Sequence, residues 1–132
     1  MTMPRFFGKP LVLRLDRARR IHIPSTFRSV IKESDDRYRR HDAQLGLYQL
    51  YIPQKRVVRC YTQKDYEEVV RRFGEDPTIF FTTLYKIDKQ GRTRVHYALE
   101  HLEEIVMSPA GQSLDLYELE CYPFREHLKE HM

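Results

Sequence analysis

Cysteine, glycine and long apolar runs are scarce in this sequence. The 132 residues include two cysteines, Cys60 and Cys121, which are too few for a disulfide framework and are not spaced as CxxC. We therefore expect both to be small buried side chains. No run approaches the roughly 18 apolar residues of a membrane span, and the amino-terminal segment lacks the apolar stretch and cleavage site of a signal peptide. These absences predict a cytoplasmic protein with no membrane partner.

Catalytic motifs are missing as well. The five glycines form neither GxxxxGK[ST] nor GxGxxG, the serines have no GxSxG context, and none of the six histidines belongs to an HExxH motif. We therefore predict no enzyme, no cofactor, no metal site and no small-molecule substrate.

The charge is distributed unevenly along the chain. Residues 1–99 carry 21 basic and 11 acidic side chains, a net charge of +10, whereas residues 100–132 carry 2 and 8, a net charge of −6. Clustered basic residues are the electrostatic signature of a nucleic-acid binder. The overall charge of +4 therefore hides a basic body followed by an acidic carboxyl-terminal part.

The order of structural signals occurs twice. Residues 11–15 alternate like a half-buried strand, residues 16–20 are a polar turn, and the alternation resumes at 21–23, which predicts a hairpin. Pro24 ends the pairing and starts a helix. Asp88 and Arg92 follow Asp16 and Arg20 at a spacing of 72, which indicates a repeated unit.

The two copies are predicted to continue in parallel ways. We expect a second helix with Ala98, Leu99, Leu102 and Ile105 on one face, and in each copy a strand followed by two tyrosines that pack in the core, Tyr61 with Tyr66 and Tyr117 with Tyr122. The first copy has 16 extra residues, which we predict to form a loop or extended hairpin within about 34–52. A helix capped by Thr62 should end at Gly74, residues 74–78 should link the copies, and a short helix should follow Pro123.

The Asp-x-x-x-Arg turns carry the functional prediction. An aspartate that opens such a turn can accept backbone amide hydrogen bonds and pair with the arginine four residues later, so Asp16 and Asp88 are predicted to organise the turns. An arginine offers a planar fork of donors that matches phosphate oxygens and the guanine O6/N7 edge. The alternative is a solvated hairpin tip with a weak surface ion pair. The predicted DNA contacts are Arg17, Arg19, Arg20, Lys89 and Arg92.

The segments LDRARRIHIPSTFR and IDKQGRTRV resemble the MraZ family, bacterial regulators of the division and cell-wall gene cluster. The resemblance implies an α+β, mainly β fold in which two tandem SpoVT/AbrB-like units exchange hairpins to form a pseudo-twofold β-barrel with peripheral helices. The units would be 1–73, with the inserted loop at about 34–52, and 79–132. It also implies a nucleoid-associated, ring-like homo-oligomer that binds direct repeats in double-stranded promoter DNA. Arg20 and Arg92 are carried over as DNA contacts.

Three positions depart from the family pattern. The glycine before the first motif arginine is replaced by Arg19, the usual proline of the second copy by His96, and the usual helix arginine by Glu100. Two roles stay open for the second copy, reading DNA or a structural role. The alternative function is an oligomeric scaffold that binds a protein through the acidic carboxyl-terminal part, without specific DNA binding.

Overall fold

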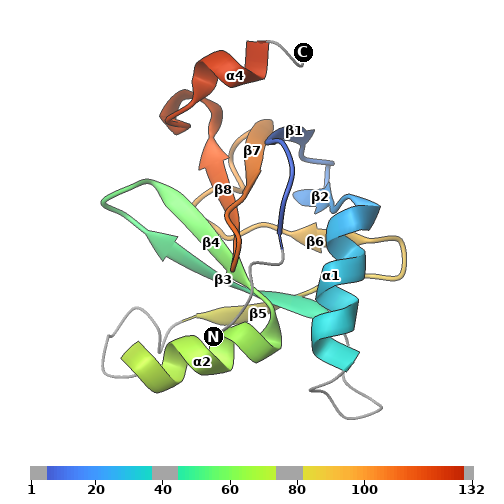
Figure 1. Ribbon diagram of the computed structural model, residues 1–132. Helices are drawn as coiled ribbons and strands as arrows, with labels where there is room; N and C mark the ends of the chain where they lie inside the picture. The colour runs from blue at the N-terminus through green and yellow to red at the C-terminus, as the bar shows by residue number, and fades with distance from the viewer. Residues whose placement is uncertain (1–5, 37–44, 74–81, 130–132) are drawn as a thin grey trace.

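The computed structural model describes residues 6–36, 45–73 and 82–129 (Figure 1). Within these ranges the fold is α+β and mainly β, with eight antiparallel strands. The strands are β1 (Leu11–Arg14), β2 (Arg20–His22), β3 (Gly46–Ile52), β4 (Val57–Tyr61), β5 (Thr83–Lys86), β6 (Arg92–Arg94), β7 (Glu104–Pro109) and β8 (Leu114–Glu118). The helical elements are α1 (Ser25–Asp36), α2 (Gln63–Phe73), the 3-10 turn η1 (Leu119–Cys121) and α4 (Arg125–Lys129).

The strands form two sheets that mix both halves of the chain. Six strands follow the order β1-β7-β8-β4-β3-β5, and β2 pairs with β6 in a separate two-stranded ribbon. The strands predicted at 11–15 and 21–23 exist, but the prediction that they pair as a hairpin is wrong. Apart from the hydrogen bonds within the turn at Asp16, β1 pairs with β7 and β2 pairs with β6. Each of the two strands therefore pairs with a strand of the second half.

The pairing pattern has an internal twofold relation. The β1–β7 pair corresponds to the β5–β3 pair, because Arg14 lies opposite Glu104 and Lys86, 72 residues after Arg14, lies opposite Gly46. The β2–β6 and β4–β8 pairs each combine equivalent strands of the two copies. The repeat seen in the sequence is thus a repeat of strand pairing, and it interlocks the two halves.

The described part of the segment 34–52, for which a loop or extended hairpin is predicted, is not a loop. Residues 34–36 complete helix α1, and β3 is an interior strand between β4 and β5. Equivalent positions are 72 residues apart in β1 and β5 and in β2 and β6, but 58 residues apart in β3 and β7. The difference places 14 of the 16 extra residues between β2 and β3. Residues 37–44 lie outside the described ranges.

The helix predicted around Ala98 is absent, and residues 97–101 form turns closed by single hydrogen bonds such as Leu99 N to His96 O, 2.8 Å. Ile105 instead belongs to β7. The eight residues between Val95 and β7 are too few for a helix of the length of α1 and a return to the sheet. Leu99 is nevertheless buried at 1% exposure, so the apolar spacing indicated burial correctly.

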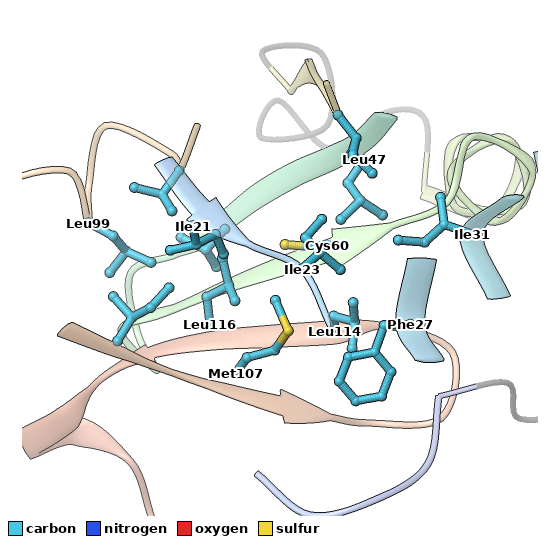
Figure 2. Packing of buried hydrophobic residues seen from close by; sticks show 14 of the residues in the cluster. Ile21, Ile23, Phe27, Ile31, Leu47, Cys60, Leu99, Met107, Leu114 and Leu116 are labelled. Atoms are coloured by element: carbon cyan, nitrogen blue, oxygen red, sulfur yellow. The ribbon is translucent and has the colours of Figure 1, made fainter. Parts of the chain in front are cut away.

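The core lies between the six-stranded sheet, the ribbon and α1, and both copies contribute to it (Figure 2). Its labelled members are Ile21, Ile23, Phe27, Ile31, Leu47, Cys60, Leu99, Met107, Leu114 and Leu116. Burial raises the pKa of the Cys60 thiol well above its ordinary value, as expected for a core cysteine, whereas Cys121 is only partly buried. The prediction that both cysteines are buried is therefore confirmed for Cys60 and wrong for Cys121.

Helix α2 begins as predicted. Thr62 caps it, because the Asp65 amide donates to Thr62 Oγ1 at 3.2 Å, and the helix extends to Phe73. Gly74 and the predicted linker at 74–78 lie outside the described residues. Tyr66 stacks on Tyr48 with ring centroids 3.8 Å apart. No helix in the described ranges has the length and apolar character needed to cross a membrane.

Candidate nucleic-acid interface

The first Asp-x-x-x-Arg turn is closed by the side chain of Asp16. Its Oδ1 accepts hydrogen bonds from the amides of Ala18 and Arg20, both at 2.9 Å, and its Oδ2 accepts one from Arg20 Nε at 3.0 Å. The Asp16 amide donates to the carbonyl of Arg20 at 2.9 Å. The Arg20 amide is the largest of the causes that lower the pKa of Asp16 from its ordinary 3.8. The carboxylate thus fixes both the backbone of the turn and the arginine side chain.

The second turn repeats this arrangement bond for bond. Asp88 Oδ1 accepts from the amides of Gln90 and Arg92, both at 2.9 Å, and Asp88 Oδ2 accepts from Arg92 Nε at 3.1 Å. The Arg92 amide likewise leads the causes that lower the pKa of Asp88. Equal geometry in two turns of different sequence follows from the shared aspartate and arginine.

The residue before the motif arginine has a left-handed backbone in both turns. Gly91 has φ 82°, and a Cβ atom there would lie 2.6–2.7 Å from the Arg28 guanidinium and its Cδ. Arg19 occupies the equivalent position with φ 62°, although this region disfavours side chains. Its Nη1 donates to the carbonyl of Leu102 at 3.2 Å, so this side chain joins the first turn to the second copy.

The two turns are brought together by the β2–β6 ribbon. Each turn leads directly into one of its strands, and the register places Arg20 opposite Arg94 and His22 opposite Arg92. Because the strands are antiparallel, the turns flank the two ends of a ribbon only three residues long. The Nη1 of Arg20 lies 3.7 Å from Asp88 Oδ2, so the first arginine also faces the second aspartate.

One face of the ribbon is cationic and the other is buried. Ile21 and Thr93 lie opposite each other with exposed fractions of 1% and 2% and point to the core. The alternate positions carry the basic side chains Arg20, His22, Arg92 and Arg94. His22 and Arg94 are exposed, whereas the side chains of Arg20 and Arg92 keep 30% and 34% of their exposure. His22 and Arg94 are not among the predicted DNA contacts, although the alternation in RIH and RTR places them on this face.

The tips of the turns project further basic side chains. Arg17 and Lys89 are equivalent positions, both are exposed, and neither forms an ion pair or side-chain hydrogen bond with another described residue. Of the predicted contacts, Arg17 and Lys89 thus present unpaired charges. Arg19, Arg20 and Arg92 are held by hydrogen bonds within the fold.

His96 stands where the first copy has Pro24, and a residue of the first copy accepts the hydrogen bond from its amide. The His96 amide donates to Gln49 Oε1 at 2.7 Å, and Gln49 Nε2 donates to the Arg94 carbonyl at 2.9 Å. The equivalent of His96 is Pro24, which has no amide hydrogen, and the equivalent of Gln49 is Met107, which has no amide oxygen. Gln49 is 1% exposed and anchors the end of β6 to the large sheet.

Several acidic side chains of the carboxyl-terminal part are engaged within the chain. Asp115 is 4% exposed and accepts hydrogen bonds from Arg59 Nε at 3.2 Å and Ser113 Oγ at 2.9 Å. Glu104 lies 3.9 Å from Arg14. Asp115 is therefore paired inside the fold, whereas Glu104 and Arg14 form a contact at the surface.

A search with models of known protein families and a search of curated proteins both return no match to this chain. Within the described residues, no group of three or more histidine, cysteine, aspartate or glutamate side chains could hold a metal ion.

Proposed function

We propose that this protein is a sequence-specific, double-stranded-DNA-binding transcriptional regulator of the MraZ type. The observation that supports the proposal is the pair of Asp-x-x-x-Arg turns. Each turn has the same set of internal hydrogen bonds, and the two turns flank a ribbon with a basic outer face. Such a protein would associate with the nucleoid and act on the promoter of a division and cell-wall gene cluster.

The shape of the basic surface suits the DNA major groove. This groove admits a two-stranded β-ribbon, and contacts to phosphates on either side fix the position of the ribbon on the duplex. The unpaired Arg17 and Lys89 at the turn tips would contact phosphates, while Arg20 and Arg92 would approach from the ends of the ribbon. Asp16 and Asp88 act as turn organisers, since their oxygens are used by amides and by the motif arginines.

We further propose that the two units, 1–73 and 79–132, form a pseudo-twofold swapped-hairpin barrel and that protomers associate into a ring. The exchange of β1 and β5 between the units supports the first part. A ring would present several copies of the interface to direct repeats in the promoter. Weak individual contacts then combine through high effective concentration.

The test is a gel-shift titration with the DNA upstream of the protein's own gene and a scrambled duplex of the same composition. Tight binding to the first alone is expected. Arg20→Ala should abolish this binding without changing the oligomer mass, whereas the matched variant Arg72→Ala on α2 should bind like the wild type. Equal affinity for both duplexes, or full binding by Arg20→Ala and by Arg92→Ala, would refute the proposal.

A further inference from the structure

We propose that His22 and Arg94 give the interface a direction along the DNA, with Arg94 reading a guanine and His22 reading a different base. This inference rests on the proposed function and adds to it the residues that determine specificity. Two equivalent exposed positions of the ribbon carry different side chains, His22 and Arg94.

The two motif arginines occupy equivalent positions in the ribbon. Its twofold relation exchanges Arg20 with Arg92 and places the Ile21–Thr93 pair at the centre. The exchanged arginines are identical in type, and each is bound through Nε to the aspartate of its own turn, at 3.0 and 3.1 Å. Since these two Nε–H donors are committed and the side chains are about two-thirds buried, they present similar, fixed groups at the two ends.

The same relation exchanges His22 with Arg94, and here the chemistry differs. Both side chains are exposed on the outer face. A guanidinium can donate two parallel hydrogen bonds to guanine O6 and N7, whereas an imidazole directs its two ring nitrogens apart and cannot make this two-point contact. A surface that carries one group at each of two equivalent positions distinguishes one DNA orientation from the other.

The backbone of Arg94 is held in place for this role. Its carbonyl accepts the hydrogen bond from the buried Gln49 amide at 2.9 Å, and the His96 amide two residues later binds the same Gln49. These two hydrogen bonds to Gln49 fix the backbone at the end of β6, so they limit the directions in which the Arg94 side chain can point. A contact group on a rigid element discriminates better than one on a loose loop.

The experiment is selection from a duplex library with a randomised central segment, followed by sequencing. It compares the wild type with Arg94→Lys and with the exchange variant His22→Arg/Arg94→His. Lysine keeps the charge and loses the planar fork, and the exchange variant has the composition of the wild type. Affinity for scrambled duplex, measured for all three, reports non-specific binding.

The wild type should prefer guanine at one base position by about tenfold or more. Arg94→Lys should reduce that preference to a few-fold at unchanged affinity for scrambled duplex, and the exchange should move the guanine preference to the other side of the site. If the wild type selects a sequence and neither variant changes its guanine preference, this inference alone is overturned. A wild type that selects no sequence overturns the proposed function, and this inference with it.

Discussion

Replacing Gln49 by methionine tests how the second copy tolerates a histidine where the first has a proline. Methionine is the residue at the equivalent position 107, and it keeps nearly the length and volume of glutamine. The change removes the acceptor of the His96 amide (2.7 Å) and the donor to the Arg94 carbonyl (2.9 Å). Two backbone groups then lose their partners at the junction between the ribbon and the large sheet.

The expected cost follows from these two groups. An unsatisfied buried polar group costs about 1–3 kcal/mol. Both bonds are only partly buried, which favours the lower end of this range for each. We therefore expect Gln49→Met to lower the free energy of unfolding by about 2 kcal/mol, or Tm by about 8 °C for a chain of this size. The matched control, Met107→Leu, exchanges similar volumes in the same core and should cost less than about 1.5 kcal/mol.

The assay is urea unfolding followed by circular dichroism at one fixed chain concentration, completed by a double-mutant cycle with His96→Pro. Proline has no amide hydrogen, so the combination Gln49→Met/His96→Pro recreates the pairing found at Met107 and Pro24. The double variant should be more stable than the sum of the single effects predicts, by about 1 kcal/mol. Additive effects, or a Gln49→Met protein as stable as the wild type, would refute the reasoning.

Two further predictions concern pH and the buried ion pair. Burial is the main cause that lowers the pKa of His96 from 6.5, and its Nδ1 accepts from the Ala98 amide at 3.1 Å. The imidazole of the unfolded chain then binds a proton more readily than that of the folded chain, so the free energy of unfolding should fall as the pH drops below 6.5. His96→Asn keeps a hydrogen-bond acceptor but does not titrate. Unfolding measured from pH 7 to 5 should therefore show a weaker pH dependence in this variant than in the wild type. Arg59→Met leaves the Asp115 carboxylate buried, with Ser113 as its remaining side-chain partner among the described residues. The free energy of unfolding should fall by about 2 kcal/mol. This loss is smaller than for a fully buried ion pair because Arg59 is 30% exposed. Adding Asp115→Asn should recover much of that loss, and no recovery would contradict the assigned cause.

Features that depend on neighbouring residues could be predicted from the sequence. The Asp16 turn and the Thr62 cap are each closed by bonds within four residues, so their residue types and spacing were sufficient. Alternation likewise predicted the strands β1 and β2.

Features that depend on distant residues could not be predicted. The partner of β1 is β7, which starts 90 residues after the end of β1, and alternation specifies the buried face of a strand but not its partner. The proposed roles of His22 and Arg94 depend on the β2–β6 register, which joins the exposed faces of two strands from distant parts of the chain. The Gln49 anchor likewise joins β3 to a backbone 45 residues away.

The salt dependence of DNA binding tests the assigned interface most directly. Arg17→Ala/Lys89→Ala removes the two unpaired charges at the turn tips, and Arg71→Ala/Arg72→Ala removes the same charge from α2, which lies on the opposite side of the view from the ribbon (Figure 1). With each phosphate contact contributing about −0.9 to the slope of log K against log salt, the turn-tip variant should lose about 1.8 in slope, and the α2 variant should keep the wild-type value. A turn-tip variant with the wild-type slope, or an equal loss in the α2 variant, would contradict the assignment of the DNA interface to these turns.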